Sequence, residues 1–212
     1  MSRYKTTFET WNKIASIYEE VFMDLDLYND TYALFCKELI KENPSILELG
    51  CGPGNITKQI LSKRPDSKIL GIDIAPNMIA LAKKNNPSAS FKVMDGRNIG
   101  TLKSTFDGII TGFYIPYLSK SDCFSFIKDC IRLLNNQGIL YISFVEGDYD
   151  DSGYQTGSTG DQIYFYYHDL DFLKKQLVEH QFSIINTLHK QYPKKDGTVD
   201  THTIIIAKLS IR

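Results

Sequence analysis

The sequence is poor in the residues and runs that mark several classes of protein. Its cysteines are Cys36, Cys51, Cys123 and Cys130, and no two of them form a Cys-x-x-Cys pair, so the sequence predicts neither a disulfide framework nor a metal site. No apolar run approaches the ~20 residues that cross a bilayer, and the first residues lack the apolar stretch of a secretory signal. We therefore expect a cytoplasmic protein that does not act at a membrane.

The chain also lacks an excess of charge of either sign. It contains 24 basic and 25 acidic residues, which give a formal charge of −1, and it has no long block of like charges. Because proteins that bind nucleic acids carry extended basic surfaces, we expect no nucleic-acid partner. Apolar residues make up 42% of the 212 positions, which is enough to bury the core of one domain.

Short apolar runs alternate with helical patterns in the middle of the chain. This alternation predicts an α/β fold in which a parallel sheet carries helices on both faces. The runs are almost entirely apolar, as expected for strands that are buried on both sides. The expected strands are residues 46–49, 68–74, 91–94, 106–111 and 139–145, and the expected helices are 56–61, 78–83 and 124–134.

Two segments outside this pattern are also informative. Apolar residues recur at helical spacing from Trp11 to Phe22, and a second helix is expected after Asn29-Asp30. Residues 148–161 are rich in Gly, Ser, Asp and Tyr, which predicts a long surface loop. Loops of that length in compact domains are often functional, and we expect this one to close over a substrate.

The C-terminal part of the chain predicts a hairpin. A helix over residues 170–180 is followed by two β-rich runs, 183–191 and 201–209, with Asp196-Gly197 as the turn signal between them. Such a hairpin adds one antiparallel strand to an otherwise parallel sheet.

A glycine-rich turn follows the first expected strand. In the segment Ile46–Ile56 the strand runs into Gly50, Gly52 and Gly54 and then into a helix. Glycines permit positive φ and close approach of a ligand to the backbone, and the helix N-terminus offers unpaired N–H groups. This layout is typical of a nucleotide-type site. Asn55 excludes both a phosphate-binding loop, which needs Lys there, and the dinucleotide fingerprint, which needs its third glycine there.

Acidic residues lie in or after three successive strands. Glu48 lies in the first strand, Asp73 ends the second and Asp95 follows the third. Because the carboxyl ends of parallel strands meet at one crevice, we expect these side chains to converge there. Asp73 stands at the spacing from which a carboxylate reaches both hydroxyls of a ribose, and Asp95 could accept from an exocyclic amine.

Four segments together resemble the successive motifs of the class I S-adenosylmethionine-dependent methyltransferases: Ile46–Ile56, Gly71–Met78, Val93–Arg97 and Phe106–Ile110. The resemblance extends from about Trp11 to the terminal hairpin. It implies a Rossmann-like three-layer sandwich with a seven-stranded, mostly parallel sheet, one antiparallel strand from the C-terminal hairpin, and an N-terminal helical cap. It also implies methyl transfer from S-adenosylmethionine to an unidentified small-molecule acceptor, with S-adenosylhomocysteine as the product.

The resemblance further implies which residues bind the cofactor. The glycine loop would pack under the methionine part, Glu48 would orient its amino group and Tyr18 would reach its carboxylate. Asp73 would hold the ribose and Asp95 the adenine amine. The other implied cofactor residues are Gly50, Cys51, Gly52, Ile74, Met78, Gly96, Arg97, Thr111 and Gly112. For Tyr18, and for Trp11 near it, core packing explains the pattern equally well.

On this basis we treat residues 1–212 as a single methyltransferase domain. Its expected parts are a helical cap over 1–43, a cofactor-binding core over 44–146, a substrate-side loop over 147–168, and a C-terminal helix and hairpin over 169–212. The sequence does not set the oligomeric state.

The implied chemistry is direct displacement at a sulfonium methyl group, which depends mainly on the alignment of nucleophile, carbon and sulfur. A general base is needed only when the nucleophile must lose a proton. The candidates for that role are His168, which ends an aromatic run, and Tyr114, which follows the fourth strand. For His168 a capping or packing role is the simpler interpretation, because Asp169 follows it and a helix begins there.

Two other functions fit part of the sequence. A protein that binds S-adenosylmethionine without catalysis would keep the same glycine loop and acidic residues. A nicotinamide-dependent oxidoreductase is disfavoured by Asn55 in place of the third glycine, and by the lack of a Tyr-x-x-x-Lys pair in an expected helix.

Overall fold

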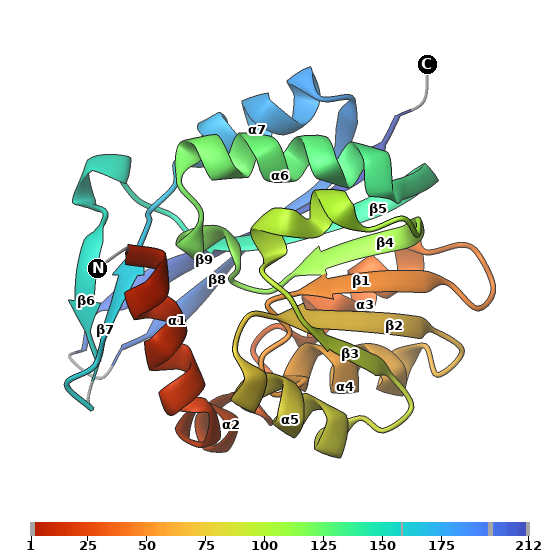
Figure 1. Ribbon diagram of the computed structural model, residues 1–212. Coiled ribbons are helices and arrows are strands. Elements are labelled where there is room, and N and C mark those ends of the chain that lie inside the picture. The colour runs from red at the N-terminus through yellow and green to blue at the C-terminus, as the bar shows by residue number, and fades with distance from the viewer. Residues whose placement is uncertain (1–2, 158, 195–196, 211–212) are drawn as a thin grey trace.

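The computed structural model describes residues 3–157, 159–194 and 197–210. Its centre is a seven-stranded sheet with the strand order β3-β2-β1-β4-β5-β9-β8 (Figure 1). Strand β9 runs antiparallel to both of its neighbours, and the other pairs are parallel. The strands are β1 (Ser45–Leu49), β2 (Lys68–Asp73), β3 (Ser90–Val93), β4 (Phe106–Thr111), β5 (Leu134–Val145), β8 (Phe182–Pro193) and β9 (Val199–Leu209).

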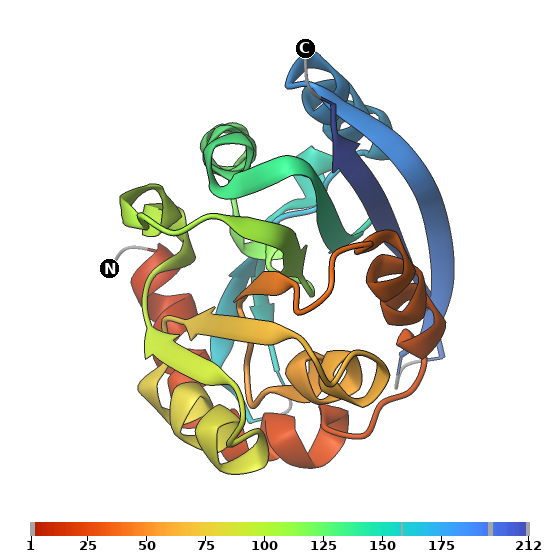
Figure 2. The same ribbon diagram turned by 90° about the vertical axis from the view of Figure 1, so that its right-hand side faces the viewer.

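Helices cover both faces of this sheet, so the molecule has three layers. Figure 2 shows α6 (Lys120–Leu133) and α7 (Leu170–Glu179) on one side, and α3 (Asn29–Glu38), α4 (Asn55–Lys63) and α5 (Pro76–Asn85) on the other. Successive residues of a strand point to opposite faces. Accordingly, Ile46 of β1 packs with α3 and α4, whereas Leu47 and Leu49 pack with α6 and α7. The fold expected from the resemblance is confirmed.

Local sequence explains where several of these helices begin. Helix α6 starts with a capping box, in which the side chains of Ser119 and Asp122 each accept from the other's backbone N–H. Asp169 caps α7 by accepting from the backbone N–H of Phe172, and Pro76 occupies the first turn of α5. In the predicted hairpin turn, Asp196 lies outside the described residues.

The N-terminal helix is divided, contrary to the single helix expected from Trp11 to Phe22. Helix α1 (Arg3–Lys13) ends before Ile14, whose φ of −94° and ψ of 14° are not helical, and α2 (Ala15–Phe22) follows at a new angle. The bend lets α1 extend along β7 while both α1 and α2 contact α5. The sequence predicts Val21 on the apolar face of this helix, but the structure exposes 57% of this residue, so the prediction is wrong there.

The segment expected to be one long loop contains regular structure. It begins with the short helix η3 (Tyr149–Asp151), and strand β6 (Gly153–Thr156) then pairs antiparallel with β7 (Gln162–Phe165) in a separate two-stranded sheet. We call β6 and β7 the ribbon. Helix α1 lies against the ribbon (Figure 1).

Two threonine side chains of α1 bond to the backbone of the ribbon. Thr7 Oγ1 accepts from the N–H of Tyr164 at 2.9 Å, and Thr10 Oγ1 donates to the carbonyl of Gln162 at 2.6 Å. The ribbon strand β7 could not be distinguished from the rest of its aromatic run by sequence alone, because these bonding partners are 157 and 152 residues away along the chain.

Candidate functional site

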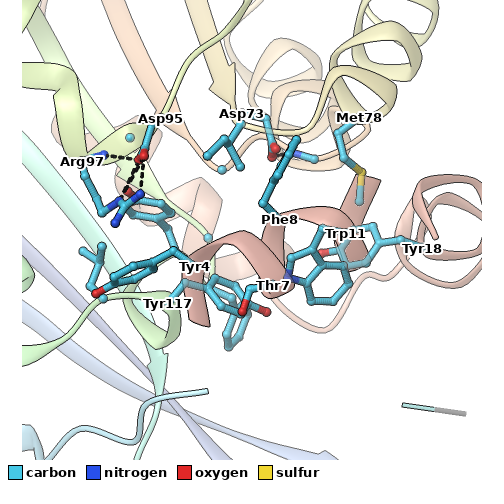
Figure 3. Close-up of a pocket in the computed structure, with 18 residues that line it drawn as sticks. Tyr4, Thr7, Phe8, Trp11, Tyr18, Asp73, Met78, Asp95, Arg97 and Tyr117 are labelled. Atoms are coloured by element: carbon cyan, nitrogen blue, oxygen red, sulfur yellow. Dashed lines mark hydrogen bonds and ion pairs between the residues drawn. The ribbon is translucent and has the colours of Figure 1, made fainter. Parts of the chain in front are cut away.

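A pocket lies at the carboxyl ends of β1, β2 and β4, the edge where ligands bind in open α/β sheets. The sheet and the turns after its strands form one side, and α1 and α2 form the other (Figure 3). The pocket is lined by Tyr4, Thr7, Phe8, Trp11, Tyr18, Gly50, Gly52, Asp73, Ile74, Met78, Asp95, Gly96, Arg97, Gly112, Phe113, Tyr114, Tyr117 and Leu118. Ten of the residues implied as cofactor contacts are among them: Tyr18, Gly50, Gly52, Asp73, Ile74, Met78, Asp95, Gly96, Arg97 and Gly112.

The glycine loop has the backbone conformation that its sequence predicts. Gly50, Gly52 and Gly54 have φ values of +63°, +52° and +86°, in the region that side-chain-bearing residues rarely adopt. A Cβ atom at Gly52 would lie 3.6 Å from the ring of Tyr18. The absence of that atom keeps open the space between the loop and the helix that covers it.

Asp73 joins the second strand to the glycine loop. Its Oδ2 accepts from the N–H of Gly52 at 3.0 Å, and its Oδ1 accepts from the N–H of Ala75 at 2.9 Å. Burial raises the pKa of Asp73, and these two backbone donors oppose that shift. A carboxylate has about four acceptor positions, so Asp73 keeps lone pairs for two hydroxyl groups in the pocket.

Asp95 and Arg97 form one paired unit after β3. Asp95 caps η1 (Gly96–Thr101) by accepting from the N–H of Arg97 at 2.9 Å, and it also accepts from the Arg97 guanidinium, with Nε 3.1 Å from Oδ1. The same guanidinium lies over the ring of Tyr4, 3.9 Å from its centroid. A ligand amine bound by Asp95 would therefore share this carboxylate with Arg97.

Helix α1 contributes four residues to the pocket that the sequence analysis did not assign there, or left open. Tyr4, Thr7, Phe8 and Trp11 follow the three-and-four spacing of one helix face, and Figure 3 shows them along α1, with Phe8 reaching toward Asp73. This spacing could have predicted a helix face, but the helix expected from the sequence begins only at Trp11. Trp11 makes edge-to-face contacts with Tyr18 at 5.5 Å and with Tyr117 at 5.9 Å.

Three of the implied cofactor residues do not line the pocket. Cys51 is buried against α5. The hydroxyl of Thr111 is buried without a partner, and so is Oε1 of Glu48, whose Oε2 accepts from Thr57. Burial raises the pKa of Glu48 to about 8. These residues are not among the lining of the pocket, and the role implied for Glu48 in orienting a ligand amino group stays a prediction.

His168 lies away from the pocket, and Tyr114 lines it but does not ionise readily. His168 is fully buried outside the pocket, and its Nε2 lies 3.0 Å from the carbonyl of Leu118, with the pKa lowered by burial to about 4. It packs in the core, as the simpler interpretation held. Tyr114 does line the pocket, but burial raises the pKa of its hydroxyl well above the ordinary value, so it stays protonated.

Residues 3–157, 159–194 and 197–210 contain neither a metal-binding group nor a membrane-spanning helix. No three or more His, Cys, Asp or Glu side chains lie together in a group that could hold a metal ion. Among the helices in those ranges, none combines the length and apolar character needed to span a membrane.

Comparisons with known proteins agree with this geometry. Residues 46–138 match the sequence model of the family described as a methyltransferase domain. A putative methyltransferase, 235L, of Invertebrate iridescent virus 6 is 31% identical over 129 residues, which are 60% of this chain and 46% of that protein. Trans-aconitate 2-methyltransferase of Escherichia coli is 34% identical over 97 residues, which are 46% of this chain and 37% of that enzyme. The chain thus matches less than half the length of these relatives.

A solved structure matches almost the whole chain. Magnesium protoporphyrin IX methyltransferase from Synechocystis PCC 6803, with bound S-adenosylmethionine, has a TM-score of 0.73 at 15% identity, with 99% of this chain and 98% of that chain covered. At this identity the likeness concerns the fold. The family match over residues 46–138, the glycine loop with its two acids and the fold together support a class I S-adenosylmethionine-dependent methyltransferase.

Proposed function

We propose that the protein binds S-adenosylmethionine in this pocket and transfers its methyl group to a small-molecule acceptor. The observation that carries the proposal is the joint geometry of Gly52 and Asp73, in which a positive-φ glycine loop is held by the carboxylate that ends the next strand. When bound, S-adenosylmethionine supplies a methyl group that is electrophilic because it is carried by a sulfonium.

Each part of the pocket has a role in this proposal. The remaining lone pairs of Asp73 would accept from the two ribose hydroxyls, and Ile74 and Met78 would pack beside the sugar and base. Asp95, with Arg97 and the backbone of Gly96, would bind the adenine edge. The glycine loop would receive the methionine part between Gly50, Gly52 and Tyr18, where the short glycines leave room.

The chain contributes to the reaction chiefly by alignment. Holding two reactants in a productive geometry can supply about 7–11 kcal/mol of an activation barrier. Helix α1 covers part of the pocket through Tyr4, Phe8 and Trp11, which would reduce the contact of a bound cofactor with water and strengthen the electrostatic interactions around it. The described lining residues hold no side chain in position to act as a strong base.

The remaining parts of the proposal follow the sequence analysis. We propose one domain, with a cap over residues 1–43, a cofactor core over 44–146, a substrate side over 147–168 and the C-terminal unit over 169–212. We also propose a cytoplasmic location and a small metabolite, not a nucleic acid, as the acceptor. The similarity to an Escherichia coli enzyme that is named for a small acid supports a small acceptor.

Calorimetric titration with S-adenosylhomocysteine tests the proposal directly, with NADH and NADPH as parallel ligands. We expect binding of S-adenosylhomocysteine alone, at micromolar concentration, because the pocket has the ribose anchor but lacks the third glycine of a dinucleotide loop. Binding of a nicotinamide cofactor instead would refute the proposal. Binding of S-adenosylhomocysteine without methyl transfer to any acceptor would favour the non-catalytic alternative.

A further inference from the structure

The lining of the pocket divides into two chemically different parts. One part holds the glycine loop, Asp73, Asp95 and Arg97. The other, which we call the aromatic half, consists of Trp11, Phe113, Tyr117 and Leu118, from α1 and from the chain that follows β4. It contains no charged side chain.

The aromatic half is firmly supported from behind. Phe113 has a φ of +56°, which is unusual for a residue with a side chain. Its ring packs edge-on against the rings of Tyr28 and His202, with centroid distances of 5.2 Å and 4.7 Å. Tyr28 Oη lies 2.6 Å from Nδ1 of His202. Tyr117 in turn contacts Phe165 of the ribbon at 6.1 Å. The aromatic faces are therefore fixed in place and form a preorganised wall for a flat molecule.

The charges of the pocket disfavour an anionic acceptor. Arg97 is the single basic residue among the described lining residues, and it is already engaged by the Asp95 carboxylate and by the ring of Tyr4. Tyr4 is itself fixed by a hydrogen bond to Asp122. A carboxylate acceptor would lose its hydration without gaining a free basic side chain of the pocket as its partner, which is costly.

The pocket also lacks a group to deprotonate an acceptor. No His, Cys or Lys occurs among the lining residues of the described chain, and Asp73 and Asp95 are held by backbone N–H groups and Arg97. Burial raises the pKa of the hydroxyls of Tyr18 and Tyr117, so these phenols are not bases at neutral pH. Alcohols and carbon acids would need such a base.

An acceptor must then present a free lone pair without first losing a proton. Alkyl amines fail this test near neutral pH, because their pKa resembles the ~10.4 of lysine and they are protonated. Nitrogens in or on an aromatic ring pass it, because their basicity is much weaker, as the pKa of ~6.5 of the histidine ring illustrates. They also provide the flat surface that the aromatic half fits.

We propose that the acceptor is an uncharged aromatic molecule that is methylated on a ring or aryl nitrogen. This inference rests on the proposed function. The nitrogen lone pair forms the N–C bond as the C–S bond breaks, so the positive charge passes from sulfur to nitrogen and the sulfur leaves as a neutral thioether. A ring nitrogen without hydrogen keeps the charge, and an aryl amine releases its proton to water after transfer. The faces of Trp11 and Tyr18 stabilise the cationic nitrogen as it forms.

The test uses bicyclic probes of one size that differ in the reacting group. Isoquinoline and 1-aminonaphthalene carry uncharged aromatic nitrogen, 1-naphthol a hydroxyl, 1-naphthoate a carboxylate and 1,2,3,4-tetrahydroisoquinoline a protonated amine. Transfer of labelled methyl from S-adenosylmethionine is measured for each probe and for trans-aconitate. We expect isoquinoline or 1-aminonaphthalene to be methylated at least tenfold faster than all the other probes.

The alternative outcomes separate this inference from the proposed function. Preferred methylation of naphthol, naphthoate, tetrahydroisoquinoline or trans-aconitate would overturn the acceptor class, and so would transfer to none of the probes while S-adenosylhomocysteine still binds. Failure of S-adenosylhomocysteine to bind would instead count against the proposed function.

A variant and a pH profile provide a second readout. Tyr117→Leu should raise KM for the nitrogen probe at least fivefold and leave the Kd of S-adenosylhomocysteine within twofold. Phe124→Leu is the control, because Phe124 of α6 is 39% exposed and lies outside the pocket, and it should change neither quantity. With isoquinoline, kcat should be flat between pH 7 and 9, because no proton is removed before transfer. A tenfold rise of kcat per pH unit would overturn the inference.

Discussion

The Asp73 carboxylate accepts a hydrogen bond from the backbone N–H of Gly52 at 3.0 Å. Two residues from the ends of neighbouring strands thereby fix each other, and the same carboxylate faces the pocket with lone pairs to spare. Recognition of a ligand and shape of the glycine loop are coupled at this contact.

Replacing Asp73 should therefore weaken ligand binding more than it weakens the fold. In Asp73→Asn the amide can present only one acceptor oxygen, so either Gly52 or Ala75 loses its partner and a ribose loses an anionic acceptor. We expect the Kd of S-adenosylhomocysteine to rise at least tenfold, equivalent to about 1.4 kcal/mol, by calorimetry. Asp24→Asn, at an exposed aspartate paired with Lys58, is the matched control and should leave Kd unchanged. Equal binding by both variants would contradict the assignment of Asp73.

A side chain at Gly52 should strain the loop. Gly52→Ala forces a residue with a Cβ atom to a φ of +52°, which costs about 1–2 kcal/mol, and it narrows the space below Tyr18. We expect a lower midpoint of thermal unfolding and a loss of S-adenosylhomocysteine binding. Gly153→Ala is the control, because Gly153 has no positive φ and no atom lies within 4 Å of the added Cβ. A Gly52→Ala variant that binds as tightly as the parent would refute the close approach of the ligand to this residue.

Stability should fall as pH rises, in part through Glu48. Burial raises the pKa of Glu48 in the folded protein to about 8 from an ordinary value of 4.5, so the folded state binds more protons than the unfolded state between these values, and stability decreases with pH in that range. The contribution of protonated Glu48 to the free energy of unfolding is complete below about pH 4.5 and is lost as the pH rises through about 8.

Glu48→Gln should flatten this dependence, since the amide oxygen can still accept from Thr57 and cannot ionise. Urea unfolding at pH 5, 7 and 9 measures it. The variant should become more stable relative to the parent as the pH increases. Parallel curves for parent and variant would show that Glu48 does not titrate in this range.

The contact of α1 with the ribbon should control how well the pocket is covered. Thr7→Val removes the oxygen that accepts from the N–H of Tyr164 at nearly constant volume. We expect faster amide hydrogen exchange in residues 3–13 and at Tyr164, and a higher Kd for S-adenosylhomocysteine by about two- to tenfold. The neighbouring Thr6→Val, at a half-buried site on the same helix, should exchange like the parent. No difference between the two variants would contradict a covering role for this bond.

The sheet and the polar part of the pocket could be predicted from the sequence because their determinants are local. Strand, glycine turn and helix follow one another within Ile46–Ile56, and Asp73 and Asp95 sit where their own strands end. Glu48, Cys51 and Thr111 do not line the pocket, because spacing along a strand fixes which end a residue occupies but not whether a loop covers it.

The covering side of the pocket was less predictable. The ribbon and α1 hold each other in place through contacts such as the hydrogen bond between Thr10 and Gln162. These two residues are 152 positions apart, so a pattern within a short stretch of sequence cannot reveal that they pair. Tyr4 and Phe8 look like any amphipathic helix face until the partner surface is known. Arg97 lines the pocket as expected, but its ion pair with Asp95 could not be predicted from the sequence. That pair depends on the turn at the start of η1, which Asp95 caps.

The hydrogen bonds from Thr7 and Thr10 to the ribbon also set an order of events at the ribosome. The glycine loop and both pocket acids are synthesised before residue 100, whereas the strand that holds α1 in place spans Gln162–Phe165. A nascent chain can thus complete the sheet side of its pocket while α1, which can already bond to α5 through Asn12 and Asn77, still lacks the ribbon. A chain arrested before the ribbon would therefore leave Thr7 and Thr10 without their ribbon partners and the aromatic face of α1 open to chaperones.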